Sequence, residues 1–144
     1  MRLAGEPAGL VGERLAGGDE LFGWASGERI VSFIWVTFHN RDVGPVRLAD
    51  GPGRVFPYNA FTLEEHRGRG LYPALLLAVR SVLGREGATE LVADVHERNT
   101  PSASGFKKAG FVPVARVAFL TIFNTWRWPL QRTMSSDRLA GQIF

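Results

Sequence analysis

The stretch of sequence that decides the fold is Glu64-Glu65-His66-Arg67-Gly68-Arg69-Gly70-Leu71-Tyr72-Pro73-Ala74-Leu75-Leu76. It joins a predicted strand to a predicted helix, and such a turn directs successive backbone N–H groups and the positive end of a helix dipole to one point. The glycines at positions 68 and 70 remove side chains that would keep a phosphate away, and the arginines at 67 and 69 add positive charge. The stretch therefore predicts a diphosphate-binding loop. A tight strand-to-helix connection with solvated arginines is the alternative.

The helix that follows is predicted from the spacing of its apolar residues. They recur three and four positions apart, which is the pattern of an amphipathic helix. Pro73 suits the first turn of this helix, and Gly84 or Gly87 suits its end. The apolar residues are Leu71, Ala74, Leu75, Ala78, Val79, Val82 and Leu83.

Upstream of the loop, the sequence predicts three strands. Leu21 to Ala25 and Ile30 to Phe38 flank a turn signal and read as a hairpin, because the second run consists mostly of β-branched and aromatic residues. Val55 to Leu63 is the third strand, and Pro57 should lie at a sheet edge or near a bulge, since proline cannot donate to a ladder. Residues 39–53 are predicted to form a loop, and one short helix is expected around residues 10–15.

Downstream of the helix, the sequence predicts a short strand over residues 90–95, a short helix over 100–109 and one or two strands over 111–123. Residues 126–144 are an aromatic segment followed by a polar tail. Alternation of strands with helices implies crossover connections onto a sheet with some parallel pairing. The fold class is therefore α/β.

Composition narrows the class of protein. The chain has 144 residues, 45% of them hydrophobic and 22% charged, as expected of one folded domain spanning residues 1–144. It contains no cysteine, no signal-peptide pattern and no apolar run long enough to cross a bilayer, so we expect a cytoplasmic protein without a membrane partner. The net charge is +3 and the basic residues are spread along the chain, so we expect neither a nucleic-acid partner nor a metal.

A second segment of the sequence makes the interpretation of this loop more specific. Arg67-Gly68-Arg69-Gly70-Leu71-Tyr72 resembles the coenzyme A pyrophosphate loop of the GNAT superfamily of N-acetyltransferases, written R/Q-x-x-G-x-G/A. In that family a strand and an N-x-x-A/S sequence follow, and an aromatic-x-K-x-G-F sequence comes after them. Asn99-Thr100-Pro101-Ser102 and Phe106-Lys107-Lys108-Ala109-Gly110-Phe111 match both at the expected offsets. The resemblance is strongest over residues 55–123.

The resemblance implies a GNAT-like mixed sheet that splays at its centre, with helices on both faces and a shortened N-terminal part. It also implies acetyl-coenzyme A (acetyl-CoA) as cofactor, with pantetheine in the gap between residues 55–63 and 91–95, and an acetyl group passed directly to the amine of a small molecule or peptide. A longer acyl chain is not excluded. The residues that the resemblance assigns to the coenzyme are Phe61, Thr62, Leu63, Arg67, Gly68, Arg69, Gly70, Leu71, Tyr72, Asn99, Ser102 and Phe106.

Three positions depart from the family pattern. Tyr72 replaces a small residue and is expected to pack under the helix or to cover the pyrophosphate. Phe106 stands where many relatives carry a tyrosine acid, and the strand before the loop lacks a carboxylate base. Tyr58 and Asp94 are therefore the catalytic candidates, Tyr58 because it lies four residues before Thr62 and hence on the same strand face. The weaker candidate bases are Glu64, Glu65, His39, His66 and His96, and water is an alternative acid.

Little sequence precedes the hairpin. The family places more covering elements there, so we expect the hairpin, with Trp24 and Trp35, to be covered by a second copy in a homodimer. The acceptor pocket is expected to be open, shared across that dimer or closed by residues 39–53. A coenzyme-binding module without catalysis, and a structural or nucleic-acid-binding domain, are the competing functions.

Overall fold

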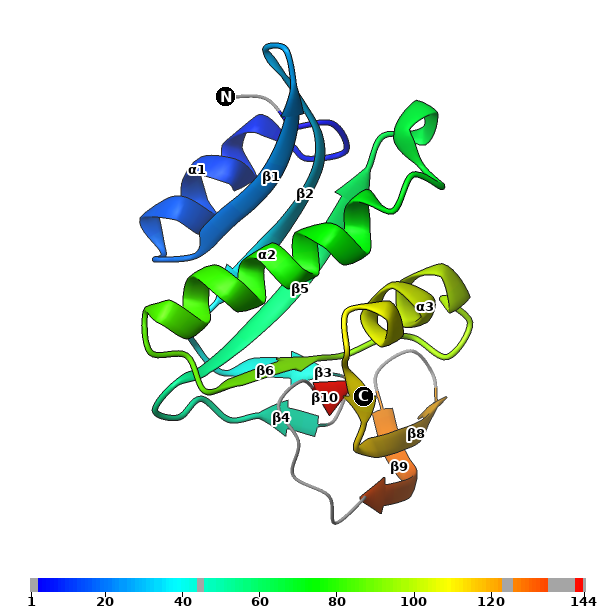
Figure 1. Ribbon diagram of the computed structural model, residues 1–144. Coiled ribbons are helices and arrows are strands. Elements are labelled where there is room, and N and C mark those ends of the chain that lie inside the picture. The colour runs from blue at the N-terminus through cyan, green and yellow to red at the C-terminus, as the bar shows by residue number, and fades with distance from the viewer. Residues whose placement is uncertain (1–2, 44–45, 123–125, 135–141, 144) are drawn as a thin grey trace.

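The computed structural model of the chain describes residues 3–43, 46–122, 126–134 and 142–143 (Figure 1). After a run of strands, helices and strands alternate over residues 54–113, as the sequence predicts. Their bounds are α1 (Ala8–Ala16), β1 (Glu20–Ser26), β2 (Arg29–Thr37), β3 (Arg41–Val43), β4 (Val46–Leu48), β5 (Arg54–Thr62), a 3-10 turn (Glu64–His66), α2 (Leu71–Arg85), β6 (Glu90–Ala93), α3 (Thr100–Lys108), β7 (Val112–Pro113), β8 (Ala115–Ile122), β9 (Trp126–Met134) and β10 (Gln142–Ile143).

The main sheet is mixed. Its six strands lie in the order β1-β2-β5-β6-β10-β7. The first three strands pair antiparallel, whereas β6 pairs parallel with β5, and β10 pairs parallel with both β6 and β7. The parallel pairing follows from the crossover through α2, which Figure 1 shows lying across the strands. The predicted α/β class is confirmed.

The sheet splays between β5 and β6. These strands pair only at Arg54 with Glu90 and at Val55 with Leu91. β5 then continues to Thr62, and within the described residues this part of β5 pairs only with β2. The predicted gap at the centre of the sheet is therefore present, and it leaves one edge of β5 open.

A β-bulge interrupts β5 beside this gap. Phe61 pairs with Phe33 and Tyr58 pairs with Trp35, so one residue of β2 lies opposite two of β5. Asn59 within the bulge has φ 46°, in the left-handed region that asparagine tolerates better than most residues. The prediction that Pro57, next to Tyr58, lies near a bulge or an edge is confirmed.

The bulge changes which side chains share a face. Tyr58 and Phe61 pack together on the α1 side, and the Phe61 ring stacks on Phe33 with a centroid separation of 5.8 Å. Thr62 instead bonds Ser32, which alternates with Phe33 along β2, through hydroxyl groups 2.8 Å apart. The expectation that Tyr58 and Thr62 share a face is wrong, because it assumed an unbroken period of two.

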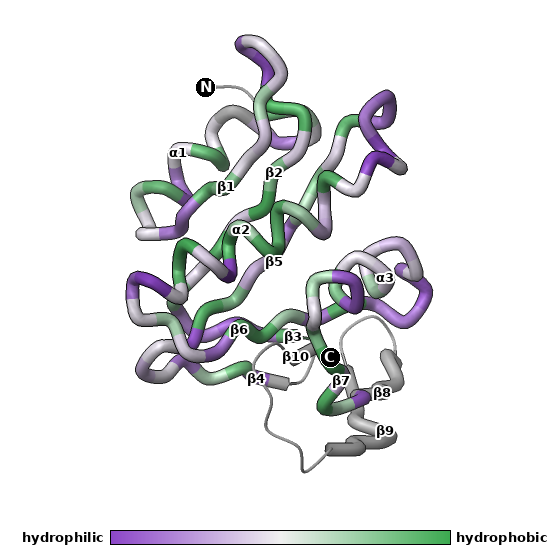
Figure 2. The backbone as a smooth tube through the Cα atoms, viewed as in Figure 1, coloured by the Kyte–Doolittle hydropathy of each residue, from purple (hydrophilic) through white to green (hydrophobic). Residues whose placement is uncertain are grey.

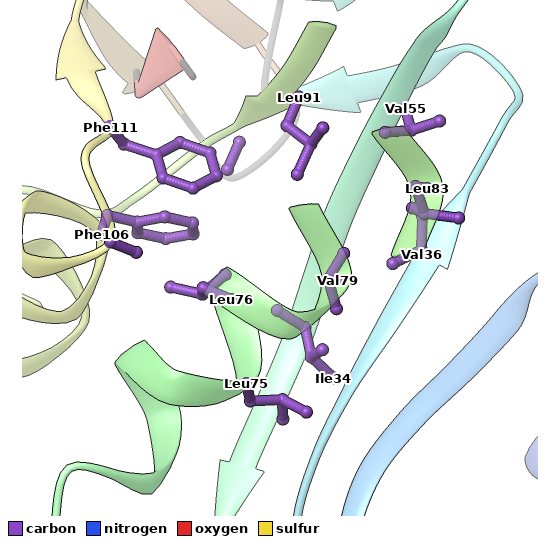
Figure 3. Close-up of a cluster of buried hydrophobic side chains, with 12 residues drawn as sticks. Ile34, Val36, Val55, Leu75, Leu76, Val79, Leu83, Leu91, Phe106 and Phe111 are labelled. Atoms are coloured by element: carbon purple, nitrogen blue, oxygen red, sulfur yellow. The ribbon is translucent and has the colours of Figure 1, made fainter. Parts of the chain in front are cut away.

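Strand alternation in β2 creates two cores, one on each face of the sheet. Ile34 and Val36 face α2, where they pack with the buried side of that helix and with residues of α3 (Figure 3). Phe33 and Trp35 face the other way and pack with Leu3 and α1. Helices therefore cover both faces, as predicted. The first core consists of Ile34, Val36, Val55, Leu75, Leu76, Val79, Leu83, Leu91, Ala93, Phe106, Ala109 and Phe111.

The second core corrects the expectation for one of the two tryptophans of the hairpin, Trp35. Trp35 is 0% exposed, because Leu3 and Val11 belong to the same buried cluster. Trp24 stays 39% exposed. The N-terminal segment thus covers Trp35 from within the chain, whereas Trp24 stays at the surface, and the homodimer stays a prediction.

Two segments are more ordered than the sequence predicts. The expected loop at residues 39–53 contains an antiparallel pair, β3 and β4, whose Leu48 packs with Phe56 and Val92. β8 and β9 pair antiparallel, and β10 from the predicted polar tail inserts between β6 and β7. No helix in the described part of the chain is long and apolar enough to cross a membrane.

Candidate active site

A groove of about 700 Å³ lies where β5 and β6 diverge. It is lined by β5, the loop before α2, the first turn of α2, the residues after β6, one side of α3 and a side chain of β3. Of the residues predicted to hold the coenzyme, the groove brings together Phe61, Thr62, Arg67, Gly68, Gly70, Leu71, Tyr72, Asn99, Ser102 and Phe106.

Two predicted coenzyme residues do not line the groove. The side chain of Leu63 is buried, with the residue 6% exposed, and its backbone N–H bonds Val31. Arg69 is exposed and lies outside the groove lining. Its neighbour Arg67 does line the groove, and its Nε donates to the carbonyl oxygen of Thr62 at 3.0 Å.

The loop before α2 presents an open cradle of backbone donors. Gly68 has φ 73° and Gly70 has φ 74°, a left-handed conformation that glycine adopts without steric cost. A β-carbon at either position would meet no protein atom within 4 Å. The first hydrogen bond of α2 runs from Ala74 N–H to Gly70, so the N–H groups of Leu71 and Tyr72 lie ahead of the helical ladder. The connection from β5 to this helix is hydrophilic in Figure 2.

Across the groove, the start of α3 is held by its own cap. Asn99 Oδ1 accepts a hydrogen bond from the backbone N–H of Ser102 at 3.2 Å, which is a typical N-cap arrangement. Both residues line the groove. The Asn-x-x-Ser sequence therefore has a structural role in starting the helix, which fixes the wall of the groove at the same time.

Tyr72 packs between α2 and α3, as one of the two predicted alternatives states. Its ring meets the Phe106 ring edge-on at 5.8 Å, and its hydroxyl lies 3.3 Å from Ser102 Oγ. Burial raises the pKa of the Tyr72 phenol, and the Ser102 hydrogen bond opposes this shift. Tyr72 thus supports the wall between the two helices.

Tyr58 sits at the part of the groove nearest the vertex of the splay, in a shell of charged groups. Its hydroxyl donates to Asp19 Oδ2 at 2.5 Å. The guanidinium carbons of Arg14 and Arg41 lie 5.2 and 4.8 Å from the ring centroid. Burial raises the pKa of the Tyr58 phenol, and the hydrogen bond to Asp19 and its charge raise it further, against a smaller opposing effect of the two arginines. The phenol is therefore neutral throughout the physiological pH range.

Asp94 also lines the groove, where its carboxylate forms an ion pair with Arg41. Its Oδ1 accepts a hydrogen bond from Arg41 Nε at 2.9 Å, in an ion pair whose side chains are 25% and 27% exposed. The carboxylate therefore already has a cationic partner among the described residues. The geometry thus gives Asp94 the role of orienting Arg41.

The remaining candidate bases are not arranged for that task. His96 lines the groove, yet its Nδ1 accepts the backbone N–H of Arg98 at 3.1 Å, so the neutral ring carries its proton on Nε2. Glu65 forms an exposed pair with Arg29 at 3.2 Å, and a backbone hydrogen bond is the main cause of its lowered pKa. His66 lines the groove, whereas Glu64, Glu65 and His39 lie outside its lining.

Sequence reasoning missed three residues around Tyr58: Asp19, Arg14 and Arg41. Tyr58 is separated from Asp19 by 39 positions, and Arg41 is separated from Asp94 by 53. No local spacing signals contacts of this kind. Arg41 lies in a segment that was predicted to be a loop, so its charge gave no sign of this contact.

Solved structures share this fold. Aminoglycoside acetyltransferase AAC(6')-Iy, in complex with the bisubstrate analogue CoA-S-monomethyl-acetylneamine, is 23% identical with a TM-score of 0.60, over 83% of this chain and 82% of the other. An N-acetyltransferase from Staphylococcus aureus Mu50 is 14% identical, with a TM-score of 0.60, over 84% and 68%. The yncA protein of Salmonella typhimurium, with its cofactor acetyl-CoA, is 17% identical, with a TM-score of 0.59, over 84% and 65%.

A comparison with curated proteins gave no match. The family model described as "Acetyltransferase (GNAT) family" matches residues 6–111 of this chain. This range includes the loop before α2, the splayed strands and α3. With the splayed sheet and the open glycine cradle at the start of α2, this match shows that the chain belongs to the GNAT family of acetyltransferases.

Proposed function

We propose that this protein transfers the acetyl group of acetyl-CoA to the amine of a small molecule or peptide by direct attack. Acetyl-CoA is the cofactor of the GNAT family. The observation that carries the proposal is one continuous groove, which joins the anion-binding start of α2 to the polar cluster of Tyr58, Arg41 and Asp94 through the gap in the sheet.

The residues of the groove fit a coenzyme with a diphosphate and a long flexible arm. The backbone N–H groups of Leu71 and Tyr72, the helix dipole and Arg67 would hold the diphosphate, and Gly68 and Gly70 leave room for it. Each hydrogen bond to a charged group is worth about 1.5–3 kcal/mol. The open edge of β5 at Phe61 and Thr62 faces the start of α3 across the groove, and polar backbone there suits the amides of pantetheine.

The protein's own contribution to the reaction is to hold the thioester and the amine in a reactive orientation. Bound acetyl-CoA supplies a thioester carbonyl, which an amine can attack. Because the diphosphate would lie at the start of α2, we expect the acyl end of the coenzyme at the other end of the groove, beside Tyr58 and Arg41. Holding the two reactants in one orientation supplies much of the rate gain in such reactions.

A coenzyme-binding module without catalysis is the second candidate. Two observations favour it: Phe106 occupies the position of the usual tyrosine acid, and the carboxylate of Asp94 is paired with Arg41. Amine transfer is the better supported function, because the far end of the groove holds a polar cluster rather than closing on apolar side chains.

The test is release of free thiol from acetyl-CoA in the presence of a panel of amines. The panel should contain an amino sugar, an aliphatic primary amine, a polyamine and a peptide with a free N-terminus. We expect thiol release that depends on at least one amine, with an acetylated product of matching mass. If acetyl-CoA binds and every amine leaves thiol release at the rate without amine, the binding-module function replaces the transferase.

A further inference from the structure

The acceptor end of the groove contains a hydrogen-bonded pair that no sequence motif identified. Tyr58 lines the groove, and behind it the partly buried carboxylate of Asp19 accepts the phenol proton at 2.5 Å. Asp19 itself is not part of the groove lining. Tyr58 thus connects the groove to a carboxylate that is not part of the groove lining.

We infer that Tyr58 and Asp19 form a proton relay for the attacking amine, in which Tyr58 touches the amine and Asp19 acts through Tyr58. The inference rests on the proposed acetyl transfer. Because the Tyr58 hydroxyl donates its proton in the hydrogen bond to Asp19, the lone pairs of its oxygen can accept a hydrogen bond from an N–H group in the groove. A hydrogen bond of this kind orients the nitrogen toward the acyl end.

The relay balances as two coupled proton transfers. As the amine forms its bond to the acyl carbon, an N–H bond breaks and its electron pair stays on nitrogen. The proton joins Tyr58 Oη, while the original Tyr58 proton passes to Asp19 Oδ2. Asp19 is partly exposed, so it returns that proton to water, and the thiolate that leaves is protonated from solvent.

Tyr58 does not perform this step alone. Its raised pKa means that the phenolate is scarcely populated, so the oxygen accepts a proton only when it gives one away at the same time. Asp19 is the group placed to receive it. The geometry therefore assigns the role of general base to a pair whose members lie 39 positions apart.

Other charged groups around Tyr58 keep the pair in position. Arg14 from α1 and Arg41 from β3 both lie over the phenol ring. Arg14 is paired with Glu6 at 2.8 Å and Arg41 with Asp94 at 2.9 Å, so neither guanidinium is left with an uncompensated charge. These two pairs hold the ring by stacking and leave the hydroxyl bonded to Asp19.

The decisive variant is Asp19→Asn, because the amide oxygen can still accept the Tyr58 hydrogen bond but cannot take up its proton. General base catalysis is worth roughly 10²–10⁴-fold, so we expect kcat/KM for the amine to fall by about tenfold or more. The KM for acetyl-CoA should stay within about twofold, since Asp19 is remote from the start of α2. Tyr58→Phe should lose a similar factor, and the double variant should be no worse than Tyr58→Phe alone.

A control and a spectroscopic readout separate the relay from a structural role. Asp50→Asn makes the same charge change at an exposed carboxylate and should leave kcat/KM unchanged. The chain has two tyrosines, so in a Tyr72→Phe background the tyrosinate absorbance reports Tyr58 alone. There Asp19→Asn should lower the pKa of Tyr58, because an anionic hydrogen-bond acceptor is lost.

The outcomes distinguish the two proposals. An active parent enzyme whose kcat/KM is unchanged by Asp19→Asn overturns the relay and leaves the transferase function intact. An unchanged Tyr58 titration overturns the hydrogen bond, and the relay with it. A parent that transfers acetyl to none of the amines overturns both.

Discussion

The ring of Tyr72 on α2 lies so close to Gly105 on α3 that a β-carbon at position 105 would stand 2.3 Å from Tyr72 Cδ1. Real side chains do not tolerate such a contact, and the ring is held in place by its edge contact with Phe106. Tyr72 replaces the small residue of the family loop, and Gly105 is its complement on the facing helix. Together they set the separation of the two helices that form one wall of the groove.

Gly105→Ala should therefore destabilise the protein. Overpacking a core typically costs about 1–3 kcal/mol, which outweighs the gain of up to ~1 kcal/mol from replacing a helical glycine. Gly84→Ala in α2 is the matched control, because its β-carbon would meet no atom within 4 Å. The measurement is urea unfolding of each variant. A Gly105→Ala protein as stable as Gly84→Ala would show that the Tyr72 ring moves aside freely.

Gly70→Ala should weaken acetyl-CoA binding by about tenfold or more, because its methyl group would enter the space facing the diphosphate and its φ of 74° strains any other residue. Gly87→Ala is the control for strain, since Gly87 has φ 100° and lies outside the groove lining. Calorimetric titration of both variants gives the comparison. Equal affinities for acetyl-CoA would place the anion elsewhere.

The two arginines of the loop before α2 should differ in their contribution to acetyl-CoA affinity. Arg67 lines the groove and Arg69 does not, so Arg67→Ala should lower acetyl-CoA affinity about tenfold at low ionic strength and Arg69→Ala by much less. The effect of Arg67→Ala should shrink as salt is added, because ions screen exposed charges. A larger loss in Arg69→Ala than in Arg67→Ala, in titrations at two salt concentrations, would contradict the arrangement of this loop.

The raised pKa of Tyr58 predicts a loss of stability in alkali. In the unfolded chain the phenol titrates near its ordinary pKa of 10.0, whereas in the fold it stays protonated to higher pH. The stability from Tyr58 is therefore fully present below pH 10.0 and declines above it, because the unfolded state then loses protons that the folded state keeps. Urea unfolding on both sides of that pH should show a steeper decline for the parent than for Tyr58→Phe. If the free energy of unfolding fell equally with pH in both proteins, the pKa of Tyr58 would not be raised by the fold.

The elements that we propose to hold the coenzyme were predictable, because their signals are local. The apolar period over α2, the glycines before it and the N-cap at Asn99 all lie within a few residues of the structures they specify. The sheet gap at Val55 and Leu91 followed from the family resemblance. These parts of the fold were predicted nearly to their observed bounds.

The acceptor end was not predictable, because its contacts are non-local. The bulge at Asn59 rotates Tyr58 to the α1 face, and no residue type forces a bulge there. Arg41 and Asp19 reach Tyr58 from segments that a propensity argument treats as loop. The insertion of β10 between β6 and β7 likewise depends on pairing with distant strands.

Binding of acetyl-CoA in this groove is tested most directly by the free energy of unfolding, measured with and without acetyl-CoA. A ligand that binds only the folded state at 100 times its dissociation constant adds about 2.7 kcal/mol of stability. We predict a gain that grows with the logarithm of acetyl-CoA concentration and is strongly reduced in Gly70→Ala. An unfolding free energy that is unchanged at millimolar acetyl-CoA would contradict the account.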